Sequence, residues 1–233
     1  MGAVVLGSLS TKVPRRRLLA WAIFVCVIGG LNLLGREETG PPDRNVLYAY
    51  STAIGGAVQY AIFLAILLAI ARGLAYREVF ALRRPRSVTA AAGWVALSLV
   101  SVSIVNVVLG QFLNAGKEQG LVPTRWEPSH AGAYAANFVV VALIAPVVEE
   151  LTFRGFGVSA IGSLVGTGAT ALWVGVAFGV WHGLVIAFPV LAVLGAILAL
   201  LRLRTDSVYP SMAAHAIFNG TALVIAVTYG SGR

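Results

Sequence analysis

Charged side chains are scarce in this sequence. Asp, Glu, Lys and Arg make up 11% of its 233 residues, against about 25% in ordinary soluble domains, whereas hydrophobic residues make up 58%. Several uncharged stretches exceed the roughly 20 residues that a helix needs to cross the hydrocarbon core of a membrane. An ordinary soluble domain is therefore excluded. Residues 18–35, 45–71, 88–116, 155–201 and 207–232 contain no Asp, Glu, Lys or Arg.

Two further absences narrow the fold class. Strand-like alternation of apolar and polar residues is lacking, so helices must satisfy the backbone within the membrane. The single cysteine, Cys26, cannot form an internal disulfide. The sequence therefore predicts an all-α polytopic transmembrane helical bundle of about seven spans, with a short helix or re-entrant turn over the Gly- and Ser-rich residues 155–166. We expect the spans near 18–34, 46–70, 89–111, 132–150, 166–182, 184–201 and 208–228.

The net charge of +8 comes from basic residues that cluster at the ends of the apolar stretches. This pattern is typical of membrane topology and not of nucleic-acid binding. A cytoplasmic N-terminus places five basic residues outside: Arg36, Arg44, Lys117, Arg125 and Arg233. It places twelve inside: Lys12, Arg15, Arg16, Arg17, Arg72, Arg77, Arg83, Arg84, Arg86, Arg154, Arg202 and Arg204. We therefore predict an N-in, C-out orientation, with Arg154 as a residue that could instead belong to a functional site.

Three short motifs place polar side chains inside apolar runs. They are EELTFR (149–154), FGVWH (178–182) and HAIFN (215–219). A carboxylate or imidazole at membrane depth costs several kcal/mol unless it is paired or lies in a water-filled cavity. Because the motifs fall on separate spans, their co-occurrence predicts one polar site that carries the function.

The first motif separates two adjacent acids. On a helix Glu150 and Arg154 are four residues apart, so they share a face and can pair. Glu149 is rotated by about 100° and points elsewhere. One acid is then held ionised by a guanidinium, while the other faces a cavity where it can act as a general base. The alternative is a helix-end motif that merely terminates a span.

The other two motifs are weaker individually. Phe178 and His182 are one helical turn apart, which places an aromatic ring beside the imidazole, although a lone histidine near a span end is often a packing residue. His215 and Asn219 also share a face. This pair can hydrogen-bond an oxyanion, ligate a metal, or bond across a helix interface.

The three motifs together supply a general base, a partner for an attacking water, and donors for a tetrahedral intermediate. Alternatively, Glu149, His182 and His215 could hold a divalent metal such as zinc, because carboxylate and imidazole are its common ligands. An HExxH motif and a GxSxG nucleophile elbow are both absent. The sequence therefore offers no support for a serine hydrolase, and the metal stays open.

In their order along the chain, EExxxR, FxxxH and HxxxN resemble the CAAX-protease and bacteriocin-processing (CPBP, Abi) family of intramembrane endopeptidases. The resemblance covers roughly residues 130–228. This family includes the eukaryotic CAAX-processing endopeptidase, which removes the C-terminal tripeptide after cysteine prenylation. The resemblance implies hydrolysis of a peptide bond in a membrane-associated or lipidated substrate.

The resemblance also implies roles for single residues. Glu149 would activate water together with His182, and His215 and Asn219 would stabilise the oxyanion. Glu150 and Arg154 would support the site, as would Phe178 beneath the histidine. Members are often labelled metalloproteases, so a divalent metal such as zinc remains possible as a cofactor.

From these implications we expect an integral protein of the plasma membrane of a bacterium, with membrane lipid and a peptide or protein substrate as partners and no nucleic acid. We divide the chain into a basic cytoplasmic N-terminus (1–17), N-terminal transmembrane helices with their loops (18–129), a catalytic core (130–228) and a C-terminal tail (229–233). Two alternatives stay open. One is a transporter or channel that uses buried Glu and His as an ion relay; the other is a non-catalytic membrane scaffold or immunity protein.

Overall fold

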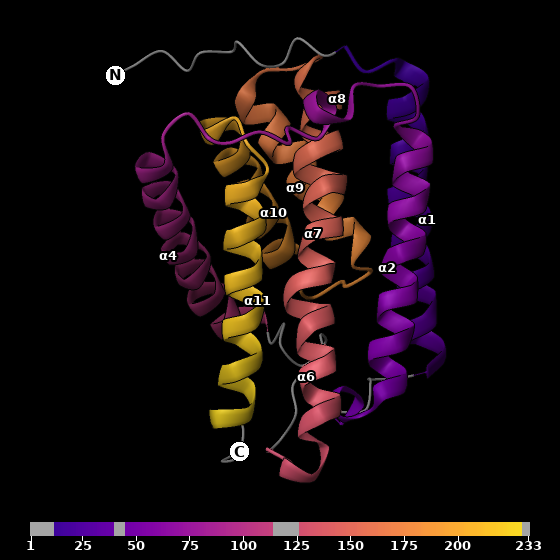
Figure 1. Ribbon diagram of the computed structural model, residues 1–233, viewed down its shortest axis with the longest axis vertical. Coiled ribbons are helices and arrows are strands. Elements are labelled where there is room, and N and C mark those ends of the chain that lie inside the picture. Colours follow the sequence, from indigo (N-terminus) through magenta and orange to yellow (C-terminus); the bar gives the residue numbers. More distant parts are fainter. Residues whose placement is uncertain (1–11, 40–44, 114–125, 230–233) are drawn as a thin grey trace.

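Helices make up the architecture of this protein, for which the computed structural model describes residues 12–39, 45–113 and 126–229. Within these residues no strand occurs, as the composition predicts. Figure 1 shows the long helices standing side by side as a bundle. Two sets of predicted features lie outside the described residues. One is the C-terminal tail, of which only Tyr229, at the end of the last helix, is described; the other is the set of outer basic residues Arg44, Lys117, Arg125 and Arg233.

Six of the described helical stretches are long and apolar enough to cross a membrane, so the chain is an integral membrane protein. The remaining predicted span, the fifth (166–182), is the apolar helix α9, Thr167–Trp181, which has only 15 residues. The N-in, C-out orientation stays a prediction. The six longer stretches are α1 (Arg15–Thr39), α2 (Tyr50–Ile70), α4 (Val88–Leu113), the composite stretch Pro128–Gly162, α10 (Phe188–Thr205) and α11 (Tyr209–Tyr229).

The composite stretch is longer than the sequence suggests. We expected the fourth span to end at residue 150, but the chain stays helical to Gly162 and turns only afterwards. Its glycines serve close packing here, because a Cβ on Gly155 would lie 2.9 Å from the ring of Phe80, and one on Gly157 would lie 2.8 Å from the ring of Trp21. In chain order the stretch comprises η2 (Pro128–His130), α6 (Ala131–Val139), π-helical Val140–Ile144, α7 (Ala145–Glu150), π-helical Leu151–Gly157 and α8 (Val158–Gly162).

Helices α9 and α10 form a tight hairpin. A Cβ on Gly175 would lie 2.4 Å from the carbonyl oxygen of Ala192, and one on Gly195 would lie 2.8 Å from the Cα of Gly175. Small residues let membrane helices approach this closely. With a rise of about 1.5 Å per residue, α9 is shorter than a full crossing, and Figure 1 shows the α9–α10 connection turning near mid-height of the bundle. The hairpin therefore brings the residues that follow α9 into the interior.

A salt-bridge clamp joins the loop before α4 to the junction between α10 and α11. Arg83 contacts Asp206 at 2.8 Å and Glu78 at 2.6 Å, and Arg202 contacts Asp206 at 3.3 Å. Burial alone would lower the pKa of Arg83, but the hydrogen bond and charge of Asp206, with those of Glu78, raise it above its ordinary value. We call these four residues the clamp; it secures one end of the bundle.

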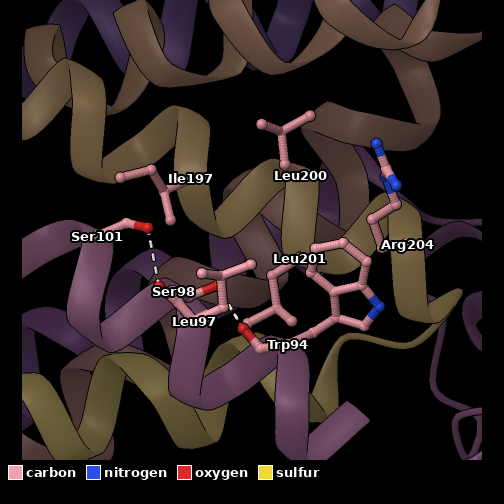
Figure 2. A pocket seen from close by; sticks show the side chains of 8 residues that line it. All are labelled: Trp94, Leu97, Ser98, Ser101, Ile197, Leu200, Leu201 and Arg204. Atoms are coloured by element: carbon pink, nitrogen blue, oxygen red, sulfur yellow. Dashed lines mark hydrogen bonds between the residues drawn. The ribbon is translucent and has the colours of Figure 1, made fainter. Parts of the chain in front are cut away.

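A groove of about 150 Å³ opens between α4 and α10. Figure 2 shows apolar side chains along it, with the guanidinium of Arg204 at one end near the indole of Trp94. Ser98 and Ser101 bond to carbonyls of their own helix. The lining contains none of the residues of the three polar motifs, so the candidate site lies elsewhere.

Candidate active site

The two acids end α7, and both are buried. Glu149 is 4% exposed and Glu150 is fully buried. The predicted pairing of Glu150 with Arg154 is confirmed: Arg154 Nη1 lies 2.9 Å from Glu150 Oε1, with both side chains inaccessible. The pair survives although the intervening residues are π-helical. Arg154 therefore belongs to this site and not to a loop, which corrects its place in the count of inner basic residues.

His215, from α11, inserts between the two acids. Its Nδ1 lies 2.9 Å from Glu150 Oε1, and its Nε2 lies 3.8 Å from Glu149 Oε2. A carboxylate only accepts hydrogen bonds, so Nδ1 carries the proton and donates to Glu150. The sequence grouped His215 only with Asn219, because contacts between different helices leave no trace in the spacing of one motif.

Tyr60, from α2, reaches the other acid and was missed by the sequence analysis. Its hydroxyl donates to Glu149 Oε1 at 2.6 Å, a distance typical of a charge-assisted bond. The two adjacent acids thus have different partners, since Glu150 faces Arg154 and His215, and Glu149 faces Tyr60. The only available signal was a phenol hydroxyl midway along an uncharged stretch.

His182 follows directly after α9 and is partly exposed. Its Nδ1 lies 2.8 Å from the carbonyl oxygen of Phe178. Because that oxygen can only accept, Nδ1 carries the proton and Nε2 keeps a free lone pair. The backbone contact therefore selects the tautomer whose Nε2 can accept a hydrogen bond from water.

The ring of Phe178 contacts both histidines and the arginine. Its centroid lies 4.6 Å from that of His182 and 5.8 Å from that of His215, both edge-on. The guanidinium carbon of Arg154 lies 4.4 Å from the same centroid, within range of a cation–π interaction. The predicted placement of Phe178 beside His182 is confirmed, and the ring also contacts His215 and Arg154.

Asn219 docks on the first π-helical segment. Its Nδ2 donates to the carbonyl oxygen of Val141 at 3.0 Å. In this segment the amide of Ala145 bonds to the carbonyl five residues earlier, that of Val140. The next residue, Pro146, has no N–H, which leaves the Val141 carbonyl for Asn219. One amide proton of Asn219 is fixed in this way, and the side chain remains partly exposed.

Comparison with known proteins gives one match. Residues 131–221 match the family described as Type II CAAX prenyl endopeptidase Rce1-like. The matched segment is similar to this family and makes up less than half of the chain. No curated protein and no solved structure matches the chain. The Rce1-like segment contains all three motifs. The match therefore supports a peptidase of the CAAX type, with its hydrolytic groups expected in this segment.

Helices outside the Rce1-like segment hold it in place. From α1, the indole of Trp21 donates to the carbonyl of Thr152 at 3.0 Å, and Asn32 donates to the carbonyl of Trp181 at 2.8 Å. Thr152 and Trp181 lie next to the acids and to His182 in sequence. The N-terminal helices therefore contribute directly to the geometry of the Rce1-like site.

The sequence left a divalent metal open as a cofactor, and this stays a prediction. Among the described residues, no group of three or more His, Cys, Asp or Glu side chains is placed to hold a metal ion. His215 gives its Nδ1 proton to Glu150, and its Nε2 lies 3.8 Å from Glu149 Oε2. We derive no step through a metal.

Proposed function

We propose that the chain is an intramembrane endopeptidase that hydrolyses a peptide bond in a membrane-associated or lipidated substrate, with Glu149 and His182 activating the water. The unequal partners of the two acids carry this proposal. Arg154 and His215 both lie 2.9 Å from Glu150. Glu149 lacks an arginine or lysine within 4 Å among the described residues, and its Oε2 has only His215 at 3.8 Å. Glu149 is therefore the acid that can accept a proton.

The first step is attack by water. The water donates one hydrogen bond to Glu149 Oε2 and the other to the free Nε2 of His182, which aims its lone pair at the substrate carbonyl carbon. As the C–O bond forms, the proton moves to Glu149 and the carbonyl π electrons move to the oxygen. Two fixed acceptors orient the nucleophile, which is the main benefit of a preorganised site.

The tetrahedral oxyanion then needs donors. The second amide proton of Asn219 is one donor, since the first bonds to Val141. A doubly protonated His215 would be the other donor, through Nε2, while its Nδ1–H bonds to Glu150. When the oxyanion collapses, the C–N bond breaks and Glu149 returns its proton to the departing amine.

The substrate class follows from the position of the site. The acids are buried between apolar helices, so the peptide bond must enter from within the membrane or along its surface. A lipid anchor would hold a peptide at this depth. The family description names a prenyl endopeptidase; for this chain we propose the broader class of lipidated or membrane-associated peptides.

The test is cleavage of a lipidated peptide by the purified protein in proteoliposomes. We expect Glu149→Gln and His182→Ala each to abolish cleavage, with losses of roughly 10²-fold or more, as is usual for groups that move protons in the transition state. Glu78→Gln removes an acid whose side chain is half exposed and serves as the control. Wild-type cleavage in Glu149→Gln would overturn the mechanism. An ion flux that depends on Glu149, without any cleavage, would favour a transporter.

A further inference from the structure

We propose that Tyr60 is a positioning residue of this site, which holds Oε1 of Glu149 so that Oε2 is the oxygen that takes the proton from water. Tyr60 lies on α2, outside residues 131–221, so the family match assigns it no role. The proposal rests on the proposed function of Glu149 as the base.

The contact is short and the ring that carries it is held firmly. Tyr60 Oη lies 2.6 Å from Glu149 Oε1. The ring packs edge-on against Phe63 at 5.7 Å between centroids, and Phe63 packs against Trp181 at 4.8 Å. Trp181 directly precedes His182. One row of aromatic rings therefore links the group that orients the base to the backbone of the second water-activating residue.

Without this hydroxyl Glu149 has a competing partner. His215 Nε2 stands 3.8 Å from Oε2, so a small rotation of the carboxylate would close that distance to a hydrogen-bonded ion pair. Glu149 Oε2 would then accept a hydrogen bond from the imidazole that is needed for the oxyanion, and this oxygen would no longer be free to take the proton from water. By holding Oε1, Tyr60 keeps Glu149 and His215 apart, and their two tasks stay separate.

A purely structural role is the competing explanation, because a buried hydroxyl also needs a partner for stability. The chain offers a matched control. Tyr134, on α6, is buried and its hydroxyl donates to the carbonyl of Leu223 at 2.8 Å. It belongs to a separate cluster with Leu47 and Tyr48. Tyr60→Phe and Tyr134→Phe each remove one bonded hydroxyl and leave the ring in place.

The experiment measures kcat and KM for a lipidated peptide in both variants and in Glu149→Gln. We expect Tyr60→Phe to lower kcat about 10- to 100-fold, the loss typical of a misplaced reacting group, and to leave KM within about 2-fold because Tyr60 does not bind substrate. Tyr134→Phe should keep kcat within about 2-fold of the wild type. Equal losses in the two variants, or a change in KM alone, would overturn the positioning role.

The outcomes separate this inference from the proposed function. If Glu149→Gln is inactive while Tyr60→Phe matches the wild type, Tyr60 is not a positioning residue and the function stands. If Glu149→Gln keeps its activity, the proposed function itself fails. A second measurement covers a poorly folded Tyr60→Phe: thermal unfolding in the wild-type and Glu149→Leu backgrounds. We expect Tyr60→Phe to lower the melting temperature only where Glu149 is present, and an equal drop in both backgrounds would contradict the contact.

Discussion

Two networks in this molecule join an arginine to acids, and they differ in how exposed the paired side chains are. In the clamp, Arg83 is 20% exposed and bonds to both Glu78 and Asp206. In the site, both members of the pair, Arg154 and Glu150, are inaccessible. Among the described residues, Glu150 Oε2 and Arg154 Nε have no hydrogen-bond partner, and the same holds for Nε of the buried Arg202 in the clamp. The partly exposed Arg83 pairs have the geometry expected of a stabilising contact, whereas the fully buried pair of the site carries a desolvation cost that apolar packing would avoid. Polar groups kept at such a cost point to function.

The largest effect expected from this comparison follows removal of the buried cation. Arg154→Met leaves Glu150 with His215 as its only charged partner in a dry interior, and breaking one half of a buried pair typically costs about 3–5 kcal/mol. We expect a loss of this size in the free energy of unfolding, measured by denaturant titration in detergent, together with loss of cleavage. A change below about 1 kcal/mol, the median value for exposed pairs, would show that the pair is better solvated than its burial implies.

Replacing both Glu150 and Arg154 separates the cost of burying their charges from their role in cleavage. In Glu150→Leu/Arg154→Met the buried charges are replaced by apolar side chains of similar size, an exchange that is often neutral or stabilising by about 1–4 kcal/mol. We therefore expect the double variant to unfold no more easily than the wild type and to be inactive, since His215 loses its acceptor. The measurements are the same unfolding titration and the cleavage assay. An active double variant would remove Glu150 and Arg154 from any supporting role.

A substitution in the clamp should lower the stability only slightly and should leave cleavage unchanged. Arg83→Gln removes a partly exposed pair, for which about 1 kcal/mol is the expected cost, and high salt should shrink the difference because it screens such charges. Cleavage should stay within about 2-fold of the wild type, since none of the proposed catalytic groups contacts Arg83. Unfolding at low and high salt, with the cleavage assay alongside, tests this. An activity loss as large as that of Arg154→Met would mean that the two networks are coupled.

Local spacing explains which features the sequence predicts. Glu150 and Arg154 meet because a separation of four residues places them on one helical face, and Phe178 meets His182 for the same reason. The all-α membrane fold follows from composition alone, because long uncharged stretches have no other stable arrangement in lipid.

Contacts between helices could not be predicted in this way. Nothing in α2 indicates which helix lies beside it, so the bond from Tyr60 to Glu149 had no sequence signal beyond one hydroxyl in an apolar run. The bond from Asn219 to the carbonyl of Val141 depends on a π-helical register. The one sequence feature related to this register is Pro146, which has no N–H to offer that carbonyl. The end of the fourth span was placed too early because Gly155 and Gly157 suggest a turn, whereas in the fold they make room for aromatic rings.

In the proposed mechanism Glu149 is the proton acceptor and Glu150 is not. Single-turnover cleavage of a lipidated peptide by folded Glu149→Gln tests it most directly, with the melting temperature measured on the same sample. We expect a melting temperature close to that of the wild type, because glutamine still accepts the hydrogen bond from Tyr60. We also expect no product within the time of many wild-type turnovers. A folded Glu149→Gln protein that releases product at a rate near that of the wild type would contradict it.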